Sequence, residues 1–537
     1  MKSSTTSLFP LARPDTVLAP LLGLGSLVLY LRTLAPGLLY GDSGEFQTLV
    51  YSLGMSHPTG YPVFILLGRL FTMLPLGGLA WRINLFSAVL GALTVSCIYL
   101  IVRLLAGWRL AAVTAALALA VAPLFWAFSI ITELYVPSCA FLSGIILLLL
   151  LWRRSGKLPW LGAAALLGGL SLGVHPSVAL AAPAVLMYLA LITLTPGFLT
   201  RRERGRIWLA AVSGALLGVG LAFAAFLVLD ARNPAAGYYH ATVEPALSVW
   251  GMTPADFDSP LERLKFLYAA RQFRYAMFAD PAVTMPSIAR TYMNMLPETF
   301  APLTLGLMGT GIIALFFPRW REGLLLLAGW GVQLVFITNY NIYDVLVFFI
   351  PTFVFLGIWI GTGLGALMKA LSWGARRLRW EKAATPMSVL LGIAVLGLTI
   401  QFRGGMMVDA WKARMPTFLR HVEIPGYPFP IDHPGAVQTE AQGIVDSVEE
   451  DAIVFVPWDL LYPCYFVAHI EESRTSLDFH ETYPQEGVSR LADSTLAYIE
   501  ANIDQRPIYM AERPAGLSVN YKVIHAGAGL YRILRKE

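Results

Sequence analysis

Long apolar runs separated by short polar segments fill most of the chain before residue 404. Runs such as LAPLLGLGSLVLYL and SGIILLLLLW are long enough, with their flanks, to cross a hydrocarbon core about 30 Å thick. This pattern predicts a polytopic α-helical membrane protein with about eleven spans. The expected spans cover residues 16–34, 83–104, 110–129, 138–152, 159–175, 177–196, 207–229, 301–318, 323–339, 345–367 and 386–402.

The distribution of Lys and Arg between these runs sets the expected orientation. Cytoplasmic loops are enriched in both residue types because basic clusters resist translocation. With the N-terminus inside, every strong cluster falls in a cytoplasmic loop, including the RRERGR run at 201–206. Counting residues 61–76 as another span would move that run outside. We therefore expect amphipathic helices at 43–56 and 60–75 that lie at, or dip into, the outer face.

After residue 403 the pattern changes to short segments typical of a small α/β domain. AIVFVP, TSLDFH, RPIYM and LYRIL read as strands, and helical patterns cover 459–468 and 487–502. No phosphate-binding loop is present there, so accessory packing or acceptor binding is the expected role. The expected division is a transmembrane domain over 1–403 with outer loops at 35–82 and 230–300, and an extracytoplasmic α/β domain over 404–537.

Composition agrees with a membrane protein. Hydrophobic residues make up 56% of the 537 positions and charged residues 14%, whereas soluble domains carry roughly 25% charged residues. The formal charge of +5 comes largely from the loop clusters, which argues against a nucleic-acid-binding protein. The three cysteines support neither a disulfide framework nor a zinc site.

The segment YGDSGEF in the first outer loop carries the most unusual acids, Asp42 and Glu45. Their spacing fits a capping box, in which Asp42 would begin a helix and Glu45 would complete the cap. Ser or Asn would cap equally well. Two ionisable groups beside hydrocarbon are costly and default to functional hypotheses. We favour a catalytic role for this pair, with a carboxylate as proton acceptor.

Other candidates converge on the same outer face from turns far apart in the chain. The rigid HPTGYP turn presents His57 and Tyr61, although a solvent-exposed turn histidine can be inert. Arg82 and Asn84 either bind a phosphate or merely extend to the interface. The expected donor-phosphate group is His57, Tyr61, Arg82, Asn84, His175, Arg271 and Arg274, and the expected acceptor or cavity group is Glu133, Tyr135, Asn339 and Asp344.

The long loop begins a helix strongly at Ser259, with Pro260 in the first position and Glu262 completing the box. Its basic and aromatic composition is typical of an interfacial helix, for which simple membrane docking is the alternative to phosphate binding. Upstream, Asp256-Phe257-Asp258 matches the DxD pattern that holds a metal ion on a nucleotide-sugar. Three-residue matches arise easily by chance, and these acids also lead into the helix cap.

The segment TLAPGLLYGDSGEFQTLVYSLGMSHPTGYPVFILLGRL, followed by WRINLFSAVLGAL, resembles the opening of a multi-pass family long classed as of unknown function. That family includes the eukaryotic plexin-type protein O-mannosyltransferase and belongs to the GT-C superfamily of membrane glycosyltransferases. NYNIYDVLVFFIP and RQFRYAMF resemble it too, so the resemblance covers roughly residues 25–365. The family usually reads HPPGYP where this chain has HPTGYP, a conservative departure.

The resemblance implies an inverting, metal-independent glycosyltransferase with an extracytoplasmic active site. Its donor would be a polyprenyl-phosphate-linked sugar, its acceptor a hydroxyl of a protein or glycan, and Asp42 its general base with Glu45 as neighbour. The short loops favour a bacterial inner membrane. A multi-pass transporter or lipid flippase is the alternative, although the inverted repeats typical of secondary transporters are not evident in the sequence.

Overall fold

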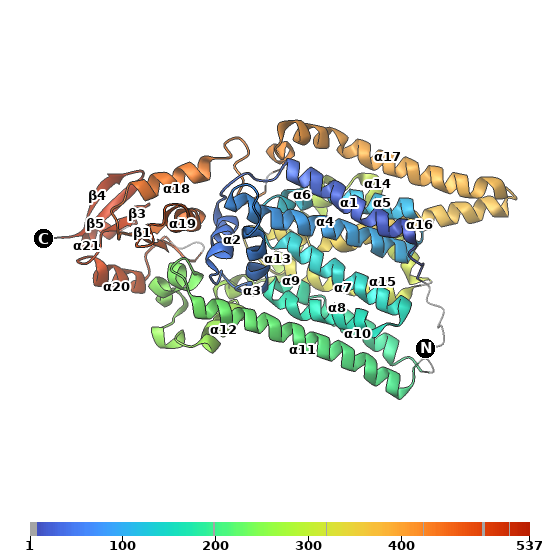
Figure 1. Ribbon diagram of the computed structural model, residues 1–537, viewed down its shortest axis with the longest axis horizontal. Helices are drawn as coiled ribbons and strands as arrows, with labels where there is room; N and C mark the ends of the chain where they lie inside the picture. Colours follow the sequence, from blue (N-terminus) through green and yellow to red (C-terminus); the bar gives the residue numbers. More distant parts are fainter. Residues whose placement is uncertain are drawn as a thin grey trace.

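The computed structural model describes residues 8–196, 199–317, 319–422, 424–485, 489–514 and 516–536. The molecule is elongated, with a helical bundle at one end and a small sheet domain at the other (Figure 1). The bundle helices are α1 (Arg13–Arg32), α4 (Leu79–Ala106), α5 (Arg109–Ala120), α6 (Pro123–Ser129), α7 (Tyr135–Ser155), α8 (Leu158–Leu170), α9 (Pro176–Ala179), α10 (Ala182–Thr193), α11 (Arg201–Arg232), α14 (Pro302–Phe316), α15 (Trp320–Ile337), α16 (Thr352–Arg377) and α17 (Glu381–Ala413).

The helices of this bundle account for the predicted spans. Within the described residues, eight helices are long and apolar enough to cross a membrane, or ten if two bent helix pairs each form one span. The shorter apolar segment Leu158–Gly173 covers the remaining prediction at 159–175. The predicted span 301–318 corresponds to α14, and its last residue lies outside the described part. The count of eleven stays a prediction.

Burial separates central from peripheral helices. In the most apolar stretch of 18 residues of each helix, 67% of the residues of α4, 78% of those of α7 and 72% of those of α16 are buried. The corresponding share is only 28% in α11 and in α17. Large hydrophobic side chains such as Leu209, Leu216 and Leu390 are exposed along the peripheral helices. An exposed apolar surface of this kind is stable in lipid rather than in water. The chain is an integral membrane protein with a mostly helical fold.

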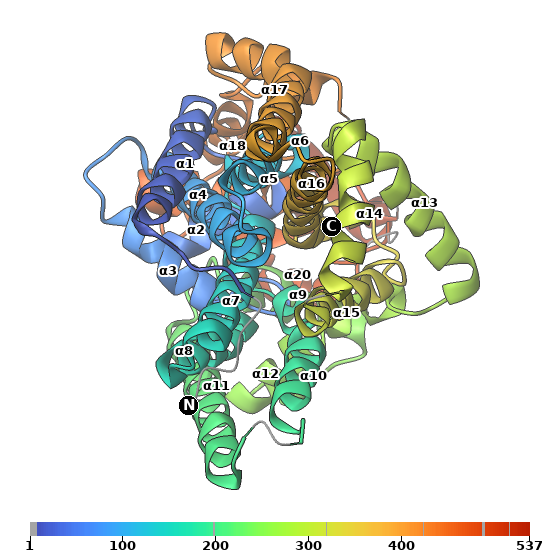
Figure 2. The ribbon, with the colours of Figure 1, turned by 90° about the vertical axis from the view of Figure 1, so that its right-hand side faces the viewer.

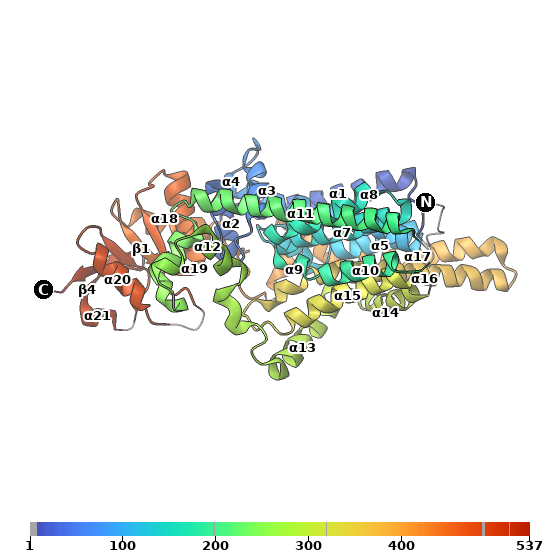
Figure 3. The ribbon, with the colours of Figure 1, turned by 90° about the horizontal axis from the view of Figure 1, so that it is seen from below.

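Four further helices lie outside the main bundle: α2 (Gly41–Ser52), α3 (Pro62–Thr72), α12 (Pro260–Tyr268) and α13 (Pro281–Thr299). The predictions of helices at 43–56 and 60–75 are confirmed by α2 and α3. Helix α13 meets α14 at a bend of 115° and projects away from the bundle (Figures 2 and 3). Ser259 caps α12 as predicted, but that helix ends earlier than the sequence pattern suggests. Ala270 adopts φ 43°, which breaks the helix before the short 3-10 helix η5 (Arg271–Ala276).

The sheet domain contains α18 (Ala436–Asp446), α19 (Trp458–Tyr465), α20 (Asp493–Asn502), α21 (Leu517–Asn520) and strands β1 (Ile453–Val456), β2 (Asp478–Glu481), β3 (Ile508–Met510), β4 (Tyr521–Gly527) and β5 (Leu530–Arg535). The strand order is β2-β1-β3-β5-β4, parallel across β2, β1 and β3 and antiparallel beyond. The four predicted strands are confirmed. Residues 487–488 of the predicted second helix lie outside the described part, and α20 covers the rest from residue 493. The boundary at residue 403 stays a prediction, and α17 runs through it without a break.

The sheet domain is joined to the membrane part where α19 packs on α2. Gly44 of α2 allows this close approach, because a Cβ there would lie 2.4 Å from the Leu39 carbonyl oxygen and 3.1 Å from Pro463 Cδ. The Thr48 hydroxyl donates to the Tyr462 carbonyl at 3.0 Å. The contact brings the first residues of α19 to the start of α2.

Substituting Gly44 with alanine should therefore loosen the junction. Forcing a methyl group into a packed contact costs about 1–3 kcal/mol, so thermal unfolding of the purified Gly44→Ala protein should occur at a lower temperature. Gly25→Ala in α1 is the matched control, since nothing lies within 4 Å of its Cβ position. Equal unfolding temperatures for both variants would contradict this account of the junction.

Candidate active site

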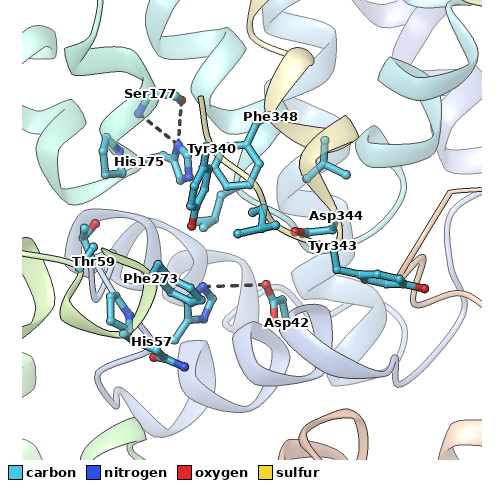
Figure 4. Close-up of a pocket in the computed structure, with 18 of the residues that line it drawn as sticks. Asp42, His57, Thr59, His175, Ser177, Phe273, Tyr340, Tyr343, Asp344 and Phe348 are labelled. Atoms are coloured by element: carbon cyan, nitrogen blue, oxygen red, sulfur yellow. Dashed lines mark hydrogen bonds and ion pairs between the residues drawn. The ribbon is translucent and has the colours of Figure 1, made fainter. Parts of the chain in front are cut away.

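A cavity of about 830 Å³ lies where the membrane helices meet the sheet domain. Its wall is built from the start of α2, the HPTGYP turn, the segments before α7 and α9, η5, the end of α15 and the loop after it, together with α19 and the end of β2. Figure 4 shows Asp42 and His57 facing each other across one side, with His175, Tyr340 and Phe348 on the other. This volume lies within the usual range of small-ligand sites.

Asp42 is the second residue of α2 and its side chain is 38% exposed toward this cavity. The Trp458 indole N–H donates to Asp42 Oδ1 at 2.8 Å, so the sheet domain fixes one oxygen of this carboxylate. The capping interpretation is wrong. The helix begins after Tyr40, no side chain caps it, and Glu45 binds a different partner.

Glu45 lies beneath Asp42 and is fully buried. Its Oε1 accepts the His57 backbone N–H at 2.8 Å, and its Oε2 lies 2.5 Å from His57 Nδ1. His57 Nε2 then faces Asp42 Oδ2 at 3.8 Å and the Tyr61 hydroxyl at 3.4 Å. The turn that holds this imidazole needs Gly60, which has φ +83° and whose Cβ would meet Met55 Sδ at 2.7 Å.

The charge of His57 follows from this geometry. Burial disfavours the imidazolium, but the carboxylates of Glu45, Asp42 and Glu133 outweigh that effect and raise the pKa of His57 to about 9. His57 is therefore a cation at neutral pH, held between Glu45 and Asp42. Its Nε2–H is the charged donor on this side of the cavity.

Glu133 and His175 belong to the same wall. Burial, followed by the negative charge of Asp42, raises the pKa of Glu133 well above its usual value, and its Oε1 accepts from the Ser43 hydroxyl at 2.9 Å. Burial and the nearby His57 lower the pKa of His175 to about 3. The backbone N–H of Ser177 donates to His175 Nδ1 at 3.2 Å, which assigns the hydrogen to Nε2.

The structure brings seven of the thirteen sequence-predicted site residues onto the cavity wall. The other six lie elsewhere. The residues that line the cavity are Asp42, His57, Tyr61, Glu133, Tyr135, His175 and Asp344.

The six residues off the wall are held by other contacts or exposed. Glu45 lies beneath the cavity, and Asn84 is buried against Gln47 and Thr132. Arg274 is exposed, and the other three donate to backbone carbonyls: Arg82 to those of Thr72 and Leu74, Arg271 to that of Trp250, and Asn339 to that of Val335.

No Lys or Arg stands among the described residues that line the cavity. Arg271 and Arg274 belong to η5, but it is their neighbours Gln272, Phe273 and Tyr275 that form the wall. Asp256 of the DxD pattern accepts the Thr253 backbone N–H at 2.9 Å. In the described part of the chain, no three His, Cys, Asp or Glu side chains are arranged to hold a metal ion.

The wall residues that the sequence did not identify include Trp458, Glu481 and Gln333. Trp458 and Glu481 come from the sheet domain, and no local pattern shows that this domain reaches Asp42. Burial raises the pKa of Glu481 to about 8, and its buried Oε2 has no hydrogen-bond partner. Gln333 is fully buried in α15, and both amide atoms lack a partner. A glutamine inside a predicted span was a signal that could have found it.

Part of the amino-acid sequence is similar to that of known proteins. A family model described as the protein O-mannosyl-transferase TMEM260 N-terminal domain matches residues 42–195, which include Asp42, His57 and His175. The protein O-mannosyl-transferase TMEM260 of Mus musculus is 32% identical over 143 residues, and that of Dictyostelium discoideum is 30% identical over 131. These matches cover 26% and 24% of this chain but only 20% and 16% of the relatives' own lengths.

The fold as a whole resembles a solved structure. ArnT from Cupriavidus metallidurans, in the apo state and bound to undecaprenyl phosphate, superposes with a TM-score of 0.57 at 14% identity. The superposition covers 97% of this chain and 98% of ArnT. The chain thus shares the fold of ArnT, and the predicted polytopic, GT-C-like fold class is confirmed.

The buried His57 should make stability fall at alkaline pH. Its pKa is about 9 in the folded protein against 6.5 for an unperturbed histidine, so the folded state retains a proton that the unfolded state loses. The contribution is complete below about pH 6.5 and declines by at most about 1.4 kcal/mol per pH unit as pH rises through 9. The measurement is thermal unfolding of wild type and His57→Gln between pH 6 and 10.

The gap between the two unfolding temperatures should be widest at pH 6 and narrow toward pH 10. Glu133 and Glu481 also have raised pKa values, and subtracting the variant curve removes their common effect. His433→Gln, at an exposed position, should leave the curve unchanged. A gap that stays constant across this range would overturn the assignment of a charged His57.

Proposed function

We propose that this protein is an inverting glycosyltransferase that moves a sugar from a polyprenyl-phosphate donor to an acceptor hydroxyl. The observation that carries the proposal is the position of Asp42, a carboxylate at the wall of an 830 Å³ cavity whose Oδ1 is bound by Trp458 and whose Oδ2 lies 3.8 Å from His57 Nε2. The names of the TMEM260 relatives and the undecaprenyl phosphate bound to ArnT support the donor and reaction class.

Asp42 acts as the general base. An acceptor hydroxyl is a weak nucleophile, and transfer of its proton to Asp42 Oδ2 accompanies attack of the oxygen on the anomeric carbon. The new glycosidic bond forms as the bond to the donor phosphate breaks, so the anomeric centre is inverted in one displacement. A single carboxylate suffices, unlike the paired acids of glycosidases. Trp458 holds the other oxygen and orients the carboxylate.

The leaving phosphate gains negative charge, and His57 is the cation that can stabilise it. Its Nε2–H lies beside the Tyr61 hydroxyl at 3.4 Å, and Glu45 on the far side of the ring keeps the imidazole charged. Neutral His175, with its hydrogen on Nε2, supplies a further donor. We propose that the reaction proceeds on these groups without a metal, and that Tyr135 and Asp344 line the acceptor side.

The sugar itself is bound by buried polar side chains of the membrane helices. Gln333 is fully buried with an unpaired donor and an unpaired acceptor, which together match adjacent hydroxyl groups of a sugar. We propose that the cavity faces the extracytoplasmic side, because the basic loops predicted to be cytoplasmic lie at the other end of the bundle (Figure 1). The short loops favour a bacterial inner membrane as its location. The acceptor is a hydroxyl of a protein or glycan.

Asp42→Asn should abolish transfer while the protein remains folded. General acid–base groups contribute about 10²–10⁴-fold to rate, so transfer from a polyprenyl-phosphate sugar should fall at least about 100-fold with little change in donor affinity. Glu440→Gln is the matched control: it also changes an acid to an amide, accepts from the neighbouring Tyr40, and lies outside the cavity wall. Full transfer by Asp42→Asn would eliminate Asp42 as the base.

Gln333→Leu should weaken binding of the sugar donor without lowering the stability of the protein. Removing an unpaired buried amide relieves a desolvation penalty of about 1–3 kcal/mol, so the unfolding temperature should rise or hold. Loss of the hydrogen bonds to sugar hydroxyls should raise the donor KM by about tenfold or more. Unaltered kinetics would refute a sugar-binding role, and a fall in unfolding temperature would mean that the amide has a structural partner.

A further inference from the structure

A second cavity, of about 500 Å³, lies at the opposite end of the bundle from the candidate active site. It is enclosed by the end of α7, the start of α8, the end of α10, the start of α11 and the start of α15. Figure 1 shows these helix ends on the side away from the sheet domain. The proposed sugar transfer gives this cavity no role.

The wall of this cavity is strongly basic. Arg153, Lys157, Arg206 and Arg321 line it, against one acid, Glu203. The Glu203 carboxylate is already engaged, because its Oε2 accepts the Thr200 backbone N–H at 2.9 Å and the Thr200 hydroxyl at 3.0 Å. The wall of the cavity therefore carries an excess of positive charge.

The basic side chains of the wall differ in whether their N–H groups have a hydrogen-bond partner in the protein. Arg321 donates to the Thr195 hydroxyl at 3.0 Å, so it is held in place by the protein. Arg153 Nε lies 3.9 Å from Glu322 Oε1, beyond hydrogen-bond distance, and it is buried without a hydrogen-bond partner. A buried guanidinium N–H of this kind needs an acceptor, and a phosphate oxygen is a strong one.

The remainder of the wall is formed by Gly156 and the apolar residues Trp152, Leu158, Pro159, Ile192, Leu199 and Ile207. A soluble anion would gain nothing from these side chains. A phospholipid matches both parts, because its phosphate pairs with the cations while its glycerol and first methylenes contact the apolar residues. Basic pockets between transmembrane helices on the cytoplasmic side are suited to anionic headgroups.

We propose that this cavity binds the headgroup of an anionic phospholipid, with its phosphate held by Arg153, Lys157 and Arg206. A lipid bound there ties together α7, α8 and α11 at their membrane-surface ends. It stabilises the fold at the end remote from the sugar-transfer cavity. The site is independent of the proposed enzymatic function and of which sugar or acceptor is used.

The test uses the purified full-length protein in detergent with phosphatidylglycerol or phosphatidylcholine of identical acyl chains. We expect phosphatidylglycerol to raise the unfolding temperature and phosphatidylcholine to have little effect. The double variant Lys157→Gln/Arg206→Gln should weaken the apparent affinity for phosphatidylglycerol at least fivefold. Native mass spectrometry should show one fewer retained phosphatidylglycerol per protein.

The matched control is Arg201→Gln/Arg202→Gln, which removes the same charge from exposed positions outside the cavity wall. This control should bind phosphatidylglycerol as wild type does. Equal binding by the Lys157/Arg206 double variant and the control overturns the proposal. Equal stabilisation by inorganic phosphate overturns it in favour of a soluble-anion site, and equal stabilisation by phosphatidylcholine overturns it in favour of a neutral lipid site.

Discussion

The buried pair of Glu45 and His57 is the interaction on which the candidate site depends. Glu45 has no exposed surface, and it binds both the backbone N–H and the ring of His57, so it ties the HPTGYP turn to α2. Breaking one partner of such a pair leaves an uncompensated charge in the interior, at a cost of about 3–5 kcal/mol. The pair also sets the charge of His57 and its orientation toward Asp42.

The sheet domain completes the site from the other side. Its helix α19 approaches α2 closely only because residue 44 is glycine, and this approach brings the Trp458 indole to Asp42. Glu481, at the end of β2, closes the same cavity. The membrane part alone would leave the proposed base with both oxygens unfixed. The domain, which was expected to serve in accessory packing or acceptor binding, therefore forms part of the candidate catalytic wall.

Much of the fold follows from periodicity, because apolar runs must cross the bilayer as helices and alternating segments must pair as strands. The strands β1, β2, β3 and β5 were predictable on this ground, whereas β4 is a largely exposed edge strand without clear alternation. The cavity was harder to predict. Local sequence identified Asp42, His57 and His175, but whether Arg271 faces inward depends on the break at Ala270, and Trp458 reaches Asp42 only through the tertiary contact.

The most direct test is a cryo-electron microscopy structure of the protein in lipid nanodiscs with a saturating polyprenyl phosphate. The account predicts phosphate density inside the 830 Å³ cavity, with an oxygen within about 3 Å of His57 Nε2 and open space beside Asp42 for an acceptor hydroxyl. Polyprenyl-phosphate density found only outside this cavity, with His57 and Asp42 untouched, would contradict it.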